Sequence, residues 1–247
     1  MAQDSKRKAA ISDRLRDASL DALAAFSTTQ VLLLTGYCPV MGTSVAIVTR
    51  EGRMGAIVPE DEMDLAQATS DAELIGYSPS TLNELTTAST SLAVPLRQLF
   101  TRFNLSGKLI GIAVEGGAQP ASYLSTHRFR SSAAALLERT DAGASVAGAD
   151  AIFDELEAVK TPIELDQIRR ACRLAAAAFT EAEKIIEPGR REDEIAADVE
   201  ARFKKVAHEH FERAQGHFFC MSGPRNSYLA SGPTHARGAG RSKLAIR

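Results

Sequence analysis

The chain has 247 residues, of which 45% are hydrophobic and 24% are charged, a balance that is normal for a folded protein of one large or two ordinary domains. Its net charge of -2 at pH 7 gives no electrostatic reason to expect binding to nucleic acid or to an anionic membrane surface. The three cysteines, Cys38, Cys172 and Cys220, form no C-x-x-C pair, so neither a structural zinc site nor a disulfide framework is indicated.

The N-terminal segment gives no sign of export. Residues 1–16 are polar and carry both signs of charge, without the apolar core of a signal peptide. The longest apolar runs, such as residues 31–34, are far too short to cross a bilayer. We therefore expect a cytoplasmic protein whose cysteines are buried, reduced thiols.

The first half of the chain alternates between helical and strand patterns. Helical spacing of apolar residues predicts helices at residues 5–20, 59–68, 92–103 and 131–139. Short apolar or β-branched runs predict strands at residues 22–26, 44–49, 54–58, 73–77 and 108–114. The second and third of these strands flank a turn at residues 50–53 and should form a hairpin. This alternation predicts a layered α/β domain.

Residues 141–148 are rich in Ala and Gly and show no periodicity. We interpret this segment as the link between two domains, which places the domains at residues 1–148 and 149–247.

The second half is expected to contain two long helices and a strand. The first helix begins near Pro162 and stops at Glu187-Pro188-Gly189, and the second starts near Arg191. A buried strand is expected at residues 217–221. Apolar residues at alternating spacings of three and four predict that the first helix has one apolar seam, made of Leu165, Ile168, Cys172, Ala175, Phe179, Ala182 and Ile186.

Several motifs in this half resemble the pita-bread metallopeptidase domain. Residues 155–171 resemble the opening "R-x-I-K-[ST]-x-x-E-[IL]-x-x-I-R-x-A", residues 186–192 the link "[IL]-x-P-G-x-[ST]-E", and residues 222–227 the "S-G-x-N-[SA]" segment. In the first half, residues 32–37 resemble "Y-L-T-G-Y" and residues 57–62 resemble "V-P-x-x-E". Their order and spacing indicate a resemblance to the creatinase/prolidase/aminopeptidase P family.

The resemblance implies an α/β architecture: an N-terminal creatinase-like domain with a mixed sheet, followed by an incomplete pita-bread α+β domain. Full-length members of this family hold two divalent metal ions (Mn, Co or Zn) with two Asp, one His and two Glu, and cleave Xaa-Pro peptides with a metal-bound water. We expect this chain to end before those ligands, so that it holds no metal ligand or catalytic residue and is inactive alone. Family members also usually dimerise, which implies a homodimer acting on a peptide or small amide.

Three residues are candidates for the substrate side of such a site. They are His217, beside two phenylalanines, Asn226, in the S-G-x-N segment, and His235, a displaced equivalent of a family histidine that would otherwise align near Ala230. The simpler interpretation of His217 is a structural role. His208 and His210 lie two positions apart and point in different directions on a helix, so we interpret them as a solvated helix end.

Two other functions stay open from the sequence. A metal-free creatinase-like amidinohydrolase shares the fold, and a non-catalytic peptide-binding module resembles it too. A departure from the family pattern also has a structural cost: Arg191 stands where a Ser or Thr usually caps the second helix, which loses about 1 kcal/mol. Because two amphipathic helices and a lone strand cannot close their apolar seams, we expect the region after about Asp150 to be less stable than the region before it.

Overall fold

The computed structural model describes residues 4–114, 130–140, 144–208, 211, 214, 216, 218, 220–222 and 244–246. The chain forms two compact units, Met1–Thr161 and Pro162–Arg247, called here the first and second units. Each unit has its own hydrophobic clusters. Among the described residues, no helix has the length and apolar character that crossing a membrane requires.

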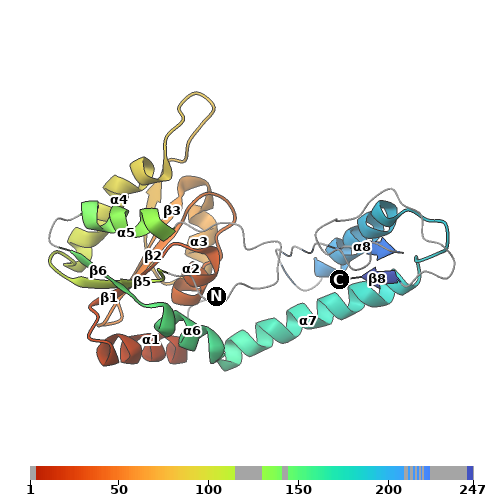
Figure 1. The fold of residues 1–247 in the computed structure, drawn as a ribbon, viewed down its shortest axis with the longest axis horizontal. Coiled ribbons are helices and arrows are strands. Elements are labelled where there is room, and N and C mark those ends of the chain that lie inside the picture. The colour runs from red at the N-terminus through yellow and green to blue at the C-terminus, as the bar shows by residue number, and fades with distance from the viewer. Residues whose placement is uncertain are drawn as a thin grey trace. The chain divides into compact units, whose positions relative to one another are not determined.

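The first unit is built on a six-stranded mixed sheet with the order β4-β3-β2-β1-β5-β6 (Figure 1). β2 pairs antiparallel with both β1 and β3, whereas β4, β5 and β6 join through parallel pairings. The predicted hairpin of β2 and β3 is confirmed. The strand bounds are β1 Ala22–Ala25, β2 Val45–Thr49, β3 Met54–Pro59, β4 Glu73–Tyr77, β5 Leu109–Ile112 and β6 Ser145–Gly148.

Hydrophobic clusters lie on both faces of this sheet, because successive strand residues point to opposite sides. Ala22 and Ala24 belong to one cluster, whereas Leu23 and Ala25 belong to the other. This two-sided burial explains why β1, β2 and β3 read as continuous apolar runs rather than as alternating ones. Both faces are therefore covered by helices.

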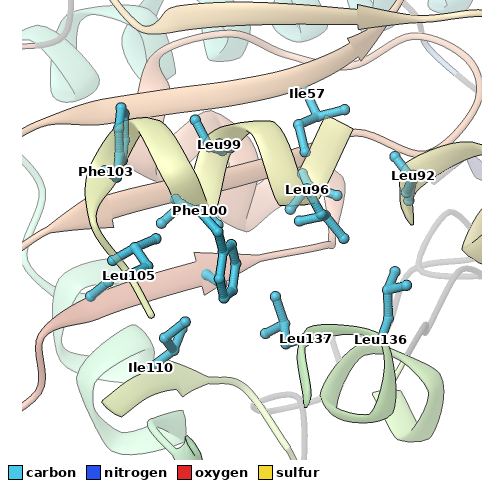
Figure 2. Packing of buried hydrophobic residues seen from close by; sticks show 14 of the residues in the cluster. Ile57, Leu92, Leu96, Leu99, Phe100, Phe103, Leu105, Ile110, Leu136 and Leu137 are labelled. Atoms are coloured by element: carbon cyan, nitrogen blue, oxygen red, sulfur yellow. The ribbon is translucent and has the colours of Figure 1, made fainter. Parts of the chain in front are cut away.

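The helices of the first unit divide between the two clusters. α4 and α5 pack on one cluster, where leucine and phenylalanine side chains such as Leu96, Phe100 and Leu137 meet (Figure 2), and α1, α2, α3 and α6 contribute to the other. The bounds are α1 Ser5–Asp17, α2 Thr28–Thr35, the 3-10 turn η1 Glu60–Glu62, α3 Met63–Thr69, α4 Ala88–Phe103, α5 Arg130–Thr140 and α6 Asp150–Ala158. The four helices predicted in this half are confirmed to within a few residues.

The interpretation of residues 141–148 as an inter-domain link is wrong for residues 145–148, which form β6. β6 pairs in parallel with β5 at the edge of the sheet. A partly buried edge strand can be built from small residues, and only one of the four residues of β6 is β-branched. The composition that usually identifies a strand is therefore weak here. Residues 141–143 lie outside the described residues.

α6 also belongs to the first unit. Phe153 and Leu156 are buried in its second cluster. The guanidinium of Arg7, itself 2% exposed, donates to the carbonyls of Leu156 at 2.5 Å and Val159 at 2.9 Å. These contacts hold the end of α6 against α1. The compact units accordingly divide after Thr161, whereas the sequence pattern placed the boundary after Gly148.

The second unit contains α7 Pro162–Glu183, α8 Glu192–Ala207, β7 Cys220–Ser222 and β8 Leu244–Ile246. Pro162 opens α7, where a missing N–H costs nothing, and Gly189 has a φ of +87° in the turn that leads to α8. The two long helices are thus confirmed. The expectation of a lone strand is wrong, because β7 pairs antiparallel with β8.

The buried side of α7 differs from the predicted seam. Leu174, Ala178 and Ala182 are buried and join the clusters that α8 completes. Of the predicted seam, only Ala182 belongs to this buried set, and Leu165, Ile168, Cys172 and Phe179 are exposed. Two apolar stripes run along α7, and α8 covers the one with the smaller side chains.

Candidate functional site

The loop between α2 and β2 is fixed by one buried carboxylate. Glu62, which is 6% exposed, accepts hydrogen bonds from the Tyr37 hydroxyl at 2.6 Å, the Val40 N–H at 2.8 Å and the Met41 N–H at 2.7 Å. Three donors converge on this carboxylate, which compensates for the removal of its charge from water. The loop backbone is thereby held in one conformation, while the side chains of Val40 and Met41 stay exposed.

A second tyrosine holds the far end of the same loop. The Tyr77 hydroxyl accepts from the Thr43 N–H at 3.2 Å and donates to the Thr43 carbonyl at 2.8 Å. Burial raises the pKa of the Tyr77 hydroxyl, which keeps it a donor. Gly42 has a φ of +68°, and a Cβ there would lie 3.1 Å from a Pro59 carbon and 3.2 Å from the Tyr77 oxygen. Glycine is therefore required at this turn for both conformation and space.

This loop forms one wall of a cavity of about 390 Å³ at the N-terminus of α2. The Ser27 side chain caps α2 by accepting from the Gln30 N–H at 3.3 Å. Ser44 also lines the cavity and is 3% exposed, and its Oγ has no hydrogen-bond partner among the residues that the structure describes. The loop contributes Pro39, Val40, Met41, Gly42 and Thr43 to the lining, and Phe26 and Thr28 complete it.

The described residues that line this cavity offer hydroxyls, backbone and apolar groups, and none of their side chains is a carboxylate, imidazole or thiol. Such a lining can hold a small polar group through hydrogen bonds, but it supplies no acid–base pair for proton transfer.

The second unit holds a buried thiol near a buried carboxyl group. Cys220 and Glu192 are each 1% exposed. Burial, with a smaller contribution from the negative charge of Glu192, raises the pKa of the Cys220 thiol from 9.0 to about 11. The thiol is therefore neutral at physiological pH and is a poor nucleophile or metal ligand.

The residues predicted for the substrate side, His217, Asn226 and His235, lie outside the described residues, as does His210. His208 is the C-cap of α8 and is exposed, which agrees with its interpretation as a solvated helix end. In the part of the chain that the structure describes, no three His, Cys, Asp or Glu side chains gather where they could hold a metal ion. These residues do not fit the two metal ions that the resemblance implies, and no catalytic step can be derived through them.

The sequence reasoning did not single out the pairing of Tyr37 with Glu62. Each residue closes one of the two first-half motifs that carried the resemblance, at residues 32–37 and 57–62. The structure shows that these motifs form one hydrogen-bonded unit. The sequence does place a carboxylate soon after an apolar strand and a tyrosine directly after a glycine that ends a helix. The spacing of the two residues, however, gave no indication that they contact each other.

Comparisons with known proteins agree with this architecture. Residues 166–244, about a third of the chain, match the model of Metallopeptidase family M24. A search of curated proteins finds no match. Among solved structures, the prolidase from Pyrococcus furiosus is similar with a TM-score of 0.68 and 18% identity, over 96% of this chain and 64% of that one.

Two further structures are similar over nearly the whole chain. The X-Pro aminopeptidase from Thermotoga maritima matches 100% of this chain and 60% of its own length, with 16% identity and a TM-score of 0.74. The Xaa-Pro dipeptidase from Bacillus anthracis matches 98% of this chain and 59% of its own, with 13% identity and a TM-score of 0.68. The chain thus spans about 60% of the length of these proteins. Residues 166–244 thus match a segment of Metallopeptidase family M24, and the chain shares its fold with prolidases and with an X-Pro aminopeptidase.

Proposed function

We propose that this chain supplies the N-terminal domain and the first part of the M24 domain of an Xaa-Pro peptidase-like metallohydrolase. The observation that supports this proposal is the shared fold: three proteins named as prolidase, X-Pro aminopeptidase and Xaa-Pro dipeptidase match 96–100% of the chain. The family segment begins in α7, within the unit where the M24 domain is expected. The substrate would be a peptide with proline after the scissile bond.

In this proposal, the first unit, Met1–Thr161, corresponds to the creatinase/prolidase N-terminal domain and the second unit, Pro162–Arg247, to the first part of the pita-bread domain. The first unit contributes the rigid loop held by Glu62 and Tyr77. We treat the 247 residues alone as inactive and assign the metal ligands to residues outside them. The complete enzyme would work in the cytoplasm as a homodimer.

The test compares two forms of the protein. The first is captured from its native cells with an antibody against the first unit, and assayed with Ala-Pro and with an Xaa-Pro tripeptide in the presence of Mn²⁺. We expect proline release that EDTA abolishes. Hydrolysis of creatine instead, or cleavage of neither peptide by the metal-loaded protein, would contradict the proposal.

The second form is the recombinant 247-residue chain. We expect no stoichiometric Mn, Co or Zn by elemental analysis after dialysis, and no cleavage of either peptide. Should this chain cleave Ala-Pro by itself, the assignment of catalysis to residues outside it would be wrong.

A further inference from the structure

The fold leaves one hydroxyl unsatisfied at the wall of the cavity between the α2–β2 loop and the start of α2. Ser44 is 3% exposed and lines this cavity, and no other buried side-chain oxygen or nitrogen in the described part of the chain lacks a hydrogen-bond partner. A buried hydroxyl without a partner costs stability, and native structures contain few of them. The backbone of the preceding residue, Thr43, is by contrast fully bonded to the Tyr77 hydroxyl. Poor local packing therefore does not account for the unsatisfied Ser44 hydroxyl.

The other polar groups at this end of α2 are also donors. Thr28 and Thr29 occupy the first two positions of the helix, where no helix carbonyl can accept from their N–H groups and where the helix dipole is positive. Ser27 Oγ already accepts from the Gln30 N–H, so its own proton can be donated to a ligand. None of the described residues that line the cavity is charged. A single negative charge suits such a site, whereas a phosphate dianion would lack a cation to pair with.

The remaining wall is apolar, and its shape is fixed in advance. The side chains of Val40 and Met41 are 48% and 74% exposed, although their backbone N–H groups are held by Glu62. A ligand that covers these side chains removes apolar area from water, and no loop has to be ordered first. Phe26 and Pro39 add further apolar area to the lining, and the volume of about 390 Å³ falls within the range of small-molecule sites.

We propose that this cavity binds a small organic carboxylate, which accepts a hydrogen bond from the Ser44 hydroxyl and covers Val40 and Met41 with its apolar body. The negative charge then lies at the N-terminus of α2. Because the Ser44 hydroxyl makes no hydrogen bond in its present rotamer, rotation about χ1 toward the ligand breaks none. The carboxylate can belong to a free acid or to the C-terminus of a peptide, since both present the same group. The inference does not depend on the proposed peptidase function.

An NMR titration of the recombinant chain with isotope-labelled methionine methyl groups tests the proposal. Phenylacetate should shift the Met41 methyl signal saturably, with a dissociation constant on the order of 1 mM for a ligand of about ten non-hydrogen atoms. The signal of Met54, which is buried in β3, should not move. Phenylacetamide and 2-phenylethylamine keep the same carbon skeleton without the negative charge. The amide should bind about tenfold more weakly, and the amine should not bind detectably, because it meets the positive end of α2.

A matched pair of serine substitutions separates this hydroxyl from others in the first unit. Ser44→Ala should weaken phenylacetate binding about tenfold, because a hydrogen bond to a charged acceptor is lost. Ser12→Ala removes another buried hydroxyl, on α1, and should leave the dissociation constant unchanged. Without ligand, Ser44→Ala should be at least as stable as the natural chain, so unfolding cannot mimic the loss of binding. Circular dichroism checks that both variants keep their helix content.

The dipeptide Gly-Phe distinguishes the two sources of the carboxylate. Tighter binding of Gly-Phe than of phenylacetate would identify a peptide C-terminus, and tighter binding of phenylacetate a free acid; either result supports the site. The absence of a saturable Met41 shift up to about 20 mM phenylacetate, roughly twenty times the expected constant, would overturn the proposal. Equal affinity for the acid, the amide and the amine would overturn it as well, because the cavity would then recognise apolar area alone. An unchanged constant for Ser44→Ala would do the same.

Discussion

The hydroxyl of Tyr37 donates a 2.6 Å hydrogen bond to the carboxylate of Glu62, and both side chains are almost completely buried. Tyr37 follows the glycine that ends α2, and Glu62 ends the 3-10 turn after β3. The bond therefore ties two segments that are 25 residues apart at the base of the α2–β2 loop. The conformation of that loop depends on the pair.

Replacing this carboxylate should destabilise the first unit. Glu62→Gln presents an amide NH₂ toward groups that are themselves donors, so at least one backbone N–H of the loop loses its acceptor. We expect a loss of about 2–4 kcal/mol in the free energy of unfolding, measured with urea. Tyr37→Phe removes only one of the three hydrogen bonds and should cost about 1.5–2 kcal/mol.

The double variant decides whether the two residues act together. Its loss should be smaller than the sum of the two single losses, because each single change already removes the shared bond. Strict additivity would contradict the coupling, and a Glu62→Gln loss below about 0.5 kcal/mol would contradict the role of the carboxylate.

Ser44 and Ser27 line the same cavity, and replacing each by alanine should change the stability of the first unit in opposite directions. The Ser44 hydroxyl is buried and has no hydrogen-bond partner in the described part of the chain, so Ser44→Ala should stabilise the first unit by about 1 kcal/mol. Ser27→Ala removes the cap of α2 and should cost about 1 kcal/mol. Thermal unfolding of both variants provides the comparison. If Ser44→Ala destabilises the unit, a bound molecule satisfies that hydroxyl in solution.

The N-terminus of α8 should gain stability from a conventional cap. Arg191 at the N-cap position has no acceptor to offer the helix, although its own N–H donates to Glu194 Oε2 at 3.2 Å and its guanidinium pairs with Asp193 at 2.6 Å. Arg191→Ser should add about 1 kcal/mol from the capping oxygen and lose no more than about 0.5 kcal/mol from the surface ion pair. Arg191→Ala loses the same pair without gaining a cap. A serine variant that unfolds no later than the alanine variant would contradict this account.

Cys220 should make the stability of the second unit sensitive to alkaline pH. Burial raises the pKa of its thiol from 9.0 to about 11, so between these values the unfolded chain releases a proton that the folded chain keeps. The stabilising contribution is complete below about pH 9 and is lost as the pH rises toward about 11. Relative to Cys220→Ala, the natural chain should lose about 1–2 kcal/mol more over this interval.

A labelling experiment checks the same burial directly. In a Cys38→Ser/Cys172→Ser background at pH 8, a disulfide reagent should leave Cys220 unmodified until denaturant is added. Rapid labelling of the native chain would show that the thiol is accessible and that the pH argument fails.

Much of the first unit could be predicted because its strands are buried on both faces. Runs such as Val45–Thr49 are apolar throughout, and their length distinguishes them from helices. β6 was not predicted, because an edge strand of Ser, Val, Ala and Gly has no distinctive composition. The motifs indicated the family, but the contact between Tyr37 and Glu62 depends on the folded arrangement of α2 and β3.

The second unit shows a different limit of sequence reasoning. The 3-4 spacing of residues 165–186 identifies an apolar stripe, but α7 has another one at Leu174, Ala178 and Ala182. Periodicity does not determine which of two stripes a neighbouring helix covers. Small alanines allow close approach of α8, and the bulkier stripe stays at the surface.

The contrast between the two units leads to a prediction about their relative stability. In the described residues, the clusters of the second unit contain five and four buried hydrophobic residues, whereas both clusters of the first unit are several times larger. Because stability follows the apolar area removed from water, the second unit should open more often. Limited proteolysis should first cut after about residue 161 and leave a resistant N-terminal fragment.

The proteolysis is read by intact-mass analysis over time. A matched control uses Ile168→Glu, which changes the surface of α7 without entering either cluster and should leave the order of cleavage unchanged. Equal resistance of both units would mean that the second unit is stabilised by interactions beyond its described clusters.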